Sequence, residues 1–299
     1  MIGCERTGTV PDERSDPGSF AGLDLTHPSA ARVYDYLLGG SANWAIDREF
    51  GQRIIDRLPL SKDMVLANRV FLNRVVRHLT RLGVRQFVDI GAGVPTAGNT
   101  HQVADQIAPD TRVVYVDNEP VAVAHAEIIL NREGDPDRHA IITADLREPD
   151  ELWHRARGTG ILDLDQPIAL LMIAVLHFFH PGPDGLDCGA ESVARYRELL
   201  SPGSYLAISH LTDDGIPADL VTKLDDVRKM YASSVSSRIL YRARAEINAL
   251  FGDFPLVDPG TVWTPQWHPE DSGSLAPNIE FSTPEQAAVW AGLARKPVQ

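Results

Sequence analysis

Two glycines and two aspartates stand where a nucleoside-binding site would need them. Gly91 and Gly93, separated by Ala92, directly follow a short apolar segment that also contains Asp89. Glycine lets the backbone turn sharply and come close to a ligand. Asp117 ends the next apolar segment of the chain. A carboxylate at that place can accept hydrogen bonds from both hydroxyls of a ribose, so the pattern predicts a nucleoside site.

The loops after the third and fourth apolar segments add further candidates. Asp145 and Leu146 follow the third segment, where a side chain or a backbone N–H can read the edge of an adenine. Ala174 and His177 follow the fourth. Each feature alone is a weak signal, because glycine turns often serve packing and acidic residues at strand ends often cap the next helix. Features in successive loops are hard to obtain from packing alone.

The glycine turn departs from the fingerprint of a dinucleotide site. That fingerprint needs a third glycine where Thr96 stands, and Pro95 lies inside the motif. Proline has no N–H, which weakens the docking of a pyrophosphate at a helix N-terminus. S-adenosylmethionine contains adenine, ribose and a sulfonium but no phosphate, and it therefore fits better. An NAD(P)-dependent oxidoreductase is the alternative.

Composition narrows the range of partners and compartments. The 299 residues carry a formal net charge of −13, which argues against a generic nucleic-acid or anionic-membrane binder. The two cysteines, Cys4 and Cys188, indicate neither a disulfide framework nor a zinc site, and they favour a cytoplasmic protein. No apolar run has the length of a membrane span. The expected partner is a small-molecule acceptor, and a homodimer stays open.

Apolar segments and amphipathic segments alternate from residue 85 onward, which predicts an α/β fold with a doubly wound, mostly parallel sheet. A helical turn at 284 followed by a strand can close that sheet in the antiparallel direction. The expected strands are 86–90, 112–117, 139–143, 167–173, 203–209, 255–263 and 289–294. The expected helices are 97–108, 120–131, 149–157, 189–200, 216–231 and 241–251.

The residues before this domain have a different character. Residues 1–24 are polar and without periodicity, which predicts a disordered tail. Residues 25–84 contain three amphipathic helices, and 85–299 form the main domain. The arginines of the third helix are expected on a solvated face: Arg69, Arg74, Arg77 and Arg81. The helices within 211–251 and the loop 267–280 are expected to shape an acceptor pocket, where Arg228, Arg238, Arg242 and Arg244 could meet an anion.

Several motifs carry a family resemblance. The segments QFVDIGAGVPT, RVVYVDNEPVAVAHA and TADLREP resemble the class I S-adenosylmethionine-dependent methyltransferases. More narrowly, the stretch from about 29 to 269 is similar to a bacterial family known simply as S-adenosyl methyltransferases and formerly of unknown function; ARVYDYLLGGSANWAIDRE and PIALLMIAVLHF are among the matching pieces. The resemblance implies a seven-stranded sheet with an antiparallel last strand, and N-terminal helices that form a lid over the cofactor.

The resemblance also implies a role for each candidate residue. Gly91 and Gly93 would lie against the methionyl part of the cofactor, and Asp117 would hold the ribose. The adenine would meet Asn118, Asp145 and Leu146, and the carbonyl of Ala174 would lie beside the sulfonium. Lid residues that could contact the cofactor or the substrate are Arg32, Tyr34, Tyr36 and Gly40; for the two tyrosines, helix packing is an equal alternative.

His177 follows the fourth strand, where a transferred methyl group would emerge. Its imidazole could act as a general base toward the acceptor, and the alternative is a histidine whose ring is satisfied by a backbone carbonyl. No metal site is predicted, because His177, His180 and His210 lack the tight helical spacing of a ligand set. The sequence leaves the acceptor open, and a non-catalytic protein that binds S-adenosylmethionine as a regulator is a further alternative.

Overall fold

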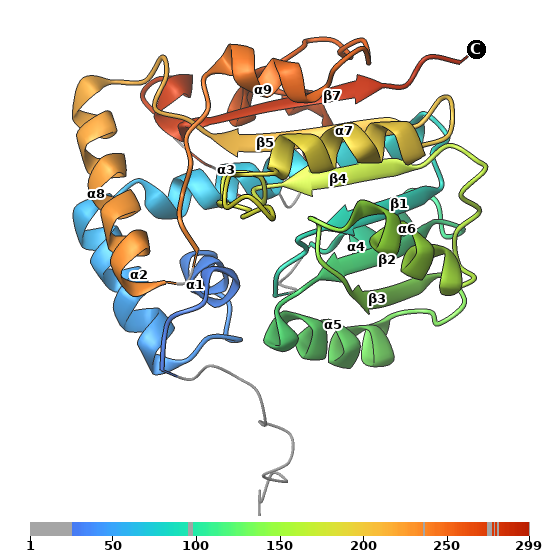
Figure 1. Ribbon diagram of the computed structural model, residues 1–299, viewed down its shortest axis with the longest axis horizontal. Coiled ribbons are helices and arrows are strands. Elements are labelled where there is room, and N and C mark those ends of the chain that lie inside the picture. The colour runs from blue at the N-terminus through green and yellow to red at the C-terminus, as the bar shows by residue number, and fades with distance from the viewer. Residues whose placement is uncertain are drawn as a thin grey trace, which may run out of the picture.

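A seven-stranded sheet forms the centre of the molecule (Figure 1). The computed structural model describes residues 26–94, 98–235, 237–273, 277, 279 and 281–298. The strand order is β3-β2-β1-β4-β5-β7-β6. β7 runs antiparallel to β5 and to β6, and the other pairs are parallel. The strands are β1 (Gln86–Ile90), β2 (Arg112–Asp117), β3 (His139–Thr143), β4 (Ala169–Ile173), β5 (Tyr205–Leu211), β6 (Val262–Trp263) and β7 (Val289–Arg295).

The strand order reverses on the two sides of β1, between β2 and β4. Val88 of β1 pairs with Val114 on one side and with Leu170 on the other. In an open α/β sheet, ligands bind at the carboxyl ends of the strands beside such a switch point. The loops that begin at residues 91, 118 and 174 therefore start at the same edge of the sheet.

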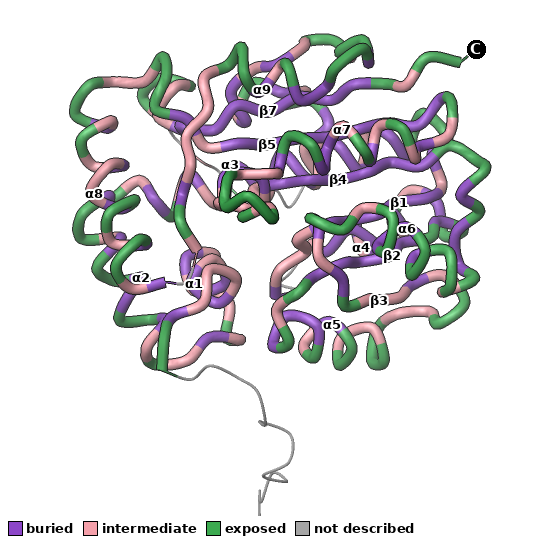
Figure 2. Tube along the Cα trace, in the orientation of Figure 1, coloured by how far each residue is buried: buried purple, intermediate pink, exposed green. Residues whose placement is uncertain are grey.

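Helices cover both faces of the sheet, which confirms the doubly wound prediction. Side chains of successive strand residues point to opposite faces: Leu170 packs with α6, α7 and α9, whereas Leu171 packs with α3 and α4. The middle of the sheet is buried throughout (Figure 2). The helices are α3 (Ser61–Arg81), α4 (Thr100–Asp105), α5 (Pro120–Glu133), α6 (Pro149–Gly158), α7 (Gly189–Leu199) and α9 (Arg244–Leu250).

Three further helices lie beyond the carboxyl ends of the parallel strands, at the left of Figure 1. They are α1 (Ala30–Leu37), α2 (Ala45–Arg57) and α8 (Ala218–Ser234). Ser29 caps α1, because its side chain accepts a hydrogen bond from the N–H of Arg32 at 3.5 Å. Phe50 of α2 and Tyr231 of α8 meet edge to face with their ring centroids 5.2 Å apart. These helices therefore share a hydrophobic cluster of their own.

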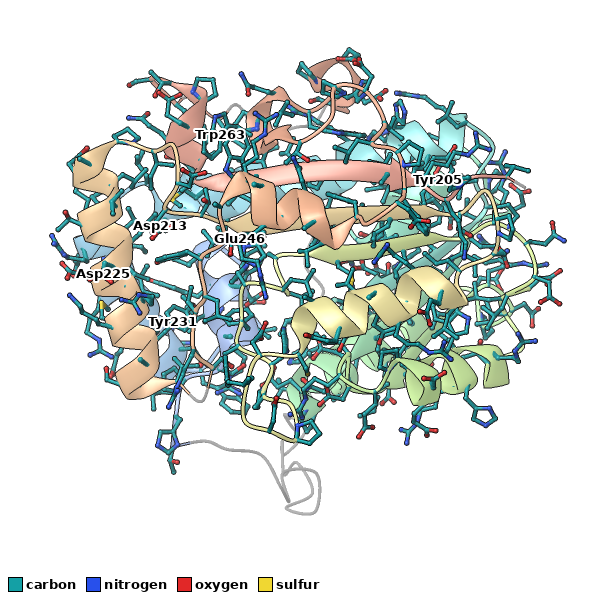
Figure 3. The ribbon with its side chains drawn as sticks, turned by 45° about the horizontal axis from the view of Figure 1, so that its top comes forward. Tyr205, Asp213, Asp225, Tyr231, Glu246 and Trp263 are labelled. Carbon is teal, nitrogen blue, oxygen red and sulfur yellow. The ribbon has the colours of Figure 1, made fainter. Side chains whose placement is uncertain are left out.

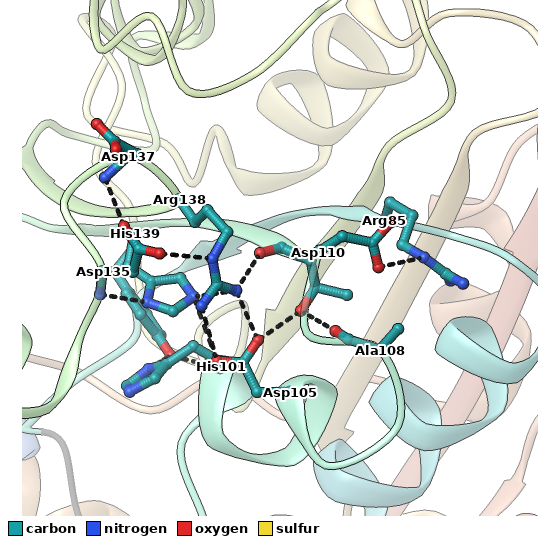
Figure 4. A network of polar contacts seen from close by, with 11 residues as sticks. Arg85, His101, Asp105, Ala108, Asp110, Asp135, Asp137, Arg138 and His139 are labelled. Carbon is teal, nitrogen blue, oxygen red and sulfur yellow. Dashed lines mark hydrogen bonds and ion pairs between the residues drawn. The ribbon is translucent and has the colours of Figure 1, made fainter.

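A polar network fixes α4 against β2 and β3 on the far side of the sheet (Figure 4). Tyr115 Oη accepts a hydrogen bond from the N–H of His101 at 2.9 Å, and Arg138 Nη1 lies 2.8 Å from Asp105 Oδ1. Burial lowers the pKa of His101 to about 4, so its ring is neutral at pH 7. This network holds the strands in place and takes no part in the cavity described below.

Two element predictions were wrong in extent. The helix expected over 97–108 spans only Thr100–Asp105, and residues 95–97 lie outside the described part of the chain. The strand expected over 255–263 is reduced to Val262–Trp263 and one bridge between Leu256 and Ala294. Pro255 and Pro259 have no N–H to donate to a neighbouring strand, which accounts for the break. The tail over 1–24 lies outside the described residues.

Candidate functional site

A cavity of about 720 Å³ opens at the carboxyl edge of the sheet. Its floor is made by the loops after β1, β2, β3 and β4, and its other side by α1, α2, α3 and α8. The sequence candidates that line it are Arg32, Tyr34, Asp89, Gly91, Ala92, Gly93, Asp117, Asn118, Leu146, Ala174 and His177. The Oη of Tyr34 donates to the carbonyl of Val65 at 3.2 Å, so this tyrosine also packs α1 against α3. This volume is in the range of cofactor and small-molecule sites.

The two glycines of the first loop serve different purposes. Both have a left-handed backbone, with φ of +69° at Gly91 and +65° at Gly93. A Cβ at Gly91 would lie 2.5 Å from Cγ2 of Val175, so glycine is needed there for contact with the loop after β4. A Cβ at Gly93 would meet no described atom within 4 Å. Gly93 therefore leaves room for a ligand against the turn.

Asp117 ties the loops after β1 and β2 together. Its Oδ2 accepts a hydrogen bond from the N–H of Gly93 at 2.8 Å, and its Oδ1 accepts one from the N–H of Glu119 at 2.9 Å. Burial raises the pKa of this carboxyl despite those bonds. A carboxylate has about four acceptor positions, so roughly two stay available toward the cavity.

Asp89 is a second buried carboxyl beside the turn. Its Oδ2 accepts a hydrogen bond from Thr100 Oγ1 at 2.7 Å. Burial raises the pKa of Asp89 to about 6, while Thr100 and the positive charge of Arg69 act in the opposite direction. Burial thus raises the pKa of both aspartates, and a positively charged ligand group would favour the ionised form of each.

Asn118 and Leu146 border the cavity from the loops after β2 and β3, but Asp145 does not line it. The carboxyl of Asp145 is held by Arg147 at 2.6 Å, and Asn118 Nδ2 lies 3.5 Å from its Oδ2. The structure thus brings Asn118 and Leu146 to the cavity and places Asp145 one layer behind them. A direct contact of Asp145 with adenine stays a prediction.

The loop after β4 carries Ala174 and His177. Ala174 has a left-handed backbone with φ of 57°, and its N–H donates to Ser209 Oγ at 2.9 Å. His177 is buried, and its Nδ1 has no hydrogen-bond partner within the described part of the chain. Burial and the neighbouring His210 lower the pKa of His177 well below its usual value. Its imidazole is therefore a neutral hydrogen-bonding group that faces the cavity, and a weak base.

The lid residues predicted from the resemblance separate into two groups. Arg32 lines the cavity, but its guanidinium already donates to Asp47 at 2.7 Å and to Glu119 at 2.9 Å. Tyr36 and Gly40 do not line the cavity: Tyr36 Oη donates to the exposed Gln52 at 3.1 Å, and Gly40 packs against the side chain of residue 35. We therefore regard Arg32 as a residue that holds α1 against α2 and against the loop after β2.

Sequence reasoning missed Arg69 of α3, which was expected on a solvated face. Arg69 lines the cavity; its Nη2 donates to Asn99 at 3.0 Å, and its buried Nε has no partner among the described residues. Arg74 is also half-buried, and it donates to the carbonyls of Thr264 and Pro265. The solvated-face prediction was thus wrong for these two arginines. The available signal was the helical spacing of Ser61, Val65, Asn68 and Leu72, which all line the cavity beside Arg69.

The other expected acceptor contacts lie elsewhere. None of Arg228, Arg238, Arg242 and Arg244 lines the cavity, nor does any described residue of 267–280. His78, His268 and Asp271 form a group with the geometry of a cation site at the last turn of α3, and none of the three lines the cavity. The carboxyl of Asp271 is already paired with Arg81 and with His78.

The fold and this site define a class I methyltransferase. Three features define this class here: the strand order with an antiparallel β7, the glycine turn after β1 and the acidic residue at the end of β2. The family model described as "S-adenosyl methyltransferase" matches residues 18–297. The chain belongs to this family, and S-adenosylmethionine is its methyl donor.

Two solved structures support this assignment. A protein from Thermobifida fusca YX, described as a candidate methyltransferase, is 33% identical with a TM-score of 0.79; the match covers 96% of this chain and 100% of that chain. A DUF574 family protein from Streptomyces avermitilis MA-4680 is also 33% identical with a TM-score of 0.79, over 91% of this chain and 98% of that chain. No curated protein matches the chain. No helix within the described residues has the length and apolarity needed to cross a membrane.

Proposed function

We propose that this protein transfers the methyl group of S-adenosylmethionine to a small-molecule acceptor bound in the same cavity. The observation that carries the proposal is the meeting of the Gly91–Gly93 turn, Asp117 and Ala174 around one cavity that also extends away from the sheet. A nucleoside cofactor and an acceptor can thus share one enclosed space.

The residues present fit the cofactor. Asp117 has acceptor positions free for the ribose, and the open side of Gly93 leaves room for the methionyl part. The Nε of Arg69, which has no partner among the described residues, is a donor for the methionyl carboxylate, and Asp89 is an acceptor for the amino group. Asn118 and Leu146 border the space for the adenine.

The cofactor supplies an activated methyl group, so the protein needs no nucleophile of its own. Bound S-adenosylmethionine would supply the methyl group, and its C–S electron pair would stay on sulfur as a lone pair of the acceptor takes up the carbon. The proton that the acceptor hydroxyl or amine loses would pass to His177 Nδ1 or to water. The chain's contribution is to orient the acceptor and to exclude water. His177, with a neutral imidazole beside Ala174, accepts a hydrogen bond from the acceptor group and orients its lone pair.

Direct titration tests the proposal against the alternatives. We expect S-adenosylmethionine and S-adenosylhomocysteine to bind with micromolar dissociation constants, and NADH and NADPH to show no heat of binding. Binding of the nicotinamide cofactors alone would support the oxidoreductase alternative. A regulator would bind S-adenosylmethionine but would transfer no labelled methyl group to any component of cell extracts, whereas an enzyme labels at least one small molecule.

A further inference from the structure

The cavity has one apolar wall. Leu37, Ile54 and Met64 come to it from α1, α2 and α3, and Leu224, Val227 and Tyr231 come from α8. All six belong to the hydrophobic cluster that joins these helices, which contains no residue of β1, β2 or β3. Figure 3 labels Tyr231 and Asp225 on α8; Tyr231 faces into the molecule, and Asp225 lies on the outer side. The apolar wall is therefore the side of the cavity away from the nucleoside loops.

Charge is confined to the other side of the cavity. The lysines, arginines, aspartates and glutamates among the described lining residues come from α1, α3, the ends of β1 and β2, and the loops after β2 and β3: Arg32, Arg69, Asp89, Asp117, Glu119 and Arg147. The described residues from α2, α8 and 237–239 that line the cavity include no such side chain. A charged acceptor group placed against the apolar wall would lose its hydration without a partner, which is strongly unfavourable.

The arginines that could have met an anion are engaged away from the cavity. Arg242 Nη2 lies 2.6 Å from Asp187 Oδ2, and its Nη1 donates to the carbonyl of Leu176 at 2.7 Å. Arg228 is paired with Asp225 on the exposed side of α8. Arg244 stacks over the ring of Trp290, with its Cζ 4.8 Å from the ring centroid. None of them would need to leave its partner for a neutral acceptor.

A few uncharged polar atoms along the apolar wall have no partner. These buried atoms are Ser61 Oγ and Asn68 Oδ1 of α3, and His177 Nδ1 of the loop after β4; each lacks a hydrogen bond to any residue that the structure describes. All three residues line the cavity. His177 is connected to the wall through Phe178, whose ring centroid lies 4.5 Å from that of His177 and 6.3 Å from that of Tyr231. Buried polar atoms normally have partners, so these are places for the polar group of a ligand.

We infer that the acceptor is an uncharged, largely apolar small molecule with a single hydroxyl or aromatic amine, which is neutral at pH 7, at the reacting end. This inference rests on the proposed function and adds the chemical class of the acceptor to it. The apolar body lies against Leu224, Val227 and Tyr231, and the hydroxyl or amine points to His177 beside Ala174.

Titration of the protein saturated with S-adenosylhomocysteine tests this inference. The probes share one ring system: 2-naphthol is uncharged at pH 7, naphthalene-2-carboxylate is an anion and 2-naphthylmethylamine is a cation. We expect 2-naphthol to bind at least tenfold more tightly than either charged probe. Equal or tighter binding of a charged probe, or no binding of 2-naphthol up to its solubility, would overturn the inference.

A pair of variants on α8 locates the binding. Val227→Phe fills the cavity at the apolar wall and should weaken 2-naphthol binding at least tenfold. Val221→Phe, on the same helix but outside the cavity lining, should leave it unchanged. An unchanged affinity in Val227→Phe would overturn the assignment of the wall. Both variants should still bind S-adenosylhomocysteine, which shows that they are folded. If the unaltered protein itself does not bind S-adenosylhomocysteine, the proposed function is contradicted instead.

Discussion

In α1, Nη1 of Arg32 lies 2.9 Å from Oε1 of Glu119, the second residue after the end of β2. The same guanidinium donates from Nε to Asp47 Oδ2 of α2 at 2.7 Å, and the side chains of Arg32 and Asp47 are almost fully buried. One arginine thus joins two N-terminal helices to the loop that follows Asp117. The position of α1 and α2 beside the cavity depends on this buried ionic group.

Replacement of Arg32 should therefore destabilise the protein. Arg32→Met leaves buried carboxylates without a partner, and breaking a buried pair typically costs about 3–5 kcal/mol. The measurement is the free energy of unfolding in urea. Arg57→Met is the matched control, because Arg57 pairs with Asp226 near the surface and such pairs contribute about 0–1 kcal/mol. Equal effects of the two substitutions would show that the buried group does not hold the lid.

Arg69 should distinguish ligands that carry the methionyl carboxylate from those that lack it. We expect Arg69→Met to weaken binding of S-adenosylhomocysteine at least tenfold, since the carboxylate loses a charged donor. Binding of methylthioadenosine, which has no carboxylate, should change little. Arg81→Met, at the exposed end of the same helix, serves as the control for titration of both ligands. A similar loss of affinity for both ligands would contradict a contact between Arg69 and the methionyl carboxylate.

Asp89 should make stability depend on pH. Its pKa in the folded state is about 6, above the usual value near 3.8, so the folded protein binds more protons than the unfolded chain between these values. The contribution of Asp89 to stability is therefore present below the lower value and is lost as the pH rises through 6. The loss is about 3 kcal/mol at most, from about 1.4 kcal/mol for each pKa unit.

The measurement is the free energy of unfolding of the unaltered protein and of Asp89→Asn from pH 4 to pH 7. The difference between the two proteins should shift in favour of Asp89→Asn as the pH rises. A difference that is independent of pH would show that Asp89 ionises with an ordinary pKa.

His177 should remain neutral across the physiological range. Burial and His210 lower its pKa well below the usual value, so its ring carbon resonance in NMR spectra should not titrate between pH 8 and pH 6. Comparison with His177→Gln assigns the resonance. Addition of 2-naphthol to the protein loaded with S-adenosylhomocysteine should shift it, because His177 lines the cavity. A titration with an inflection near 6.5 would contradict the buried, neutral imidazole.

Much of the fold was predictable because short segments of the sequence are each typical of the strand or turn that they form. The segment that became β4 is apolar throughout and those that became β1 and β2 are mostly so, as strands buried on both faces require, and the glycines mark the turn after β1. Asp117 could be found for the same reason: it ends a strand whose neighbours in the sheet follow from the alternation of strands and helices. Where prolines interrupt the pattern, near 255–259, the predicted strand was too long.

The lid side of the cavity could not be derived in this way. Helical periodicity shows which face of α3 is apolar, but it does not show that Arg69, at the edge of that face, reaches a cavity made by strand loops. Tyr36 and Gly40 were candidates only through resemblance, and their neighbours turn them away from the cavity. The apolar wall depends on contacts between α2 and α8, which lie far apart in the sequence and meet only through the tertiary fold.

Titration of Asp117→Ala with S-adenosylhomocysteine tests the central claim most directly. The account predicts a loss of affinity of at least tenfold, or about 1.4 kcal/mol, because the ribose hydroxyls lose a charged acceptor. Asp137→Ala, an exposed aspartate in the turn before β3, should bind as the unaltered protein does. Thermal unfolding shows that both variants are folded. An affinity of folded Asp117→Ala within twofold of the unaltered protein would contradict the placement of the cofactor at this site.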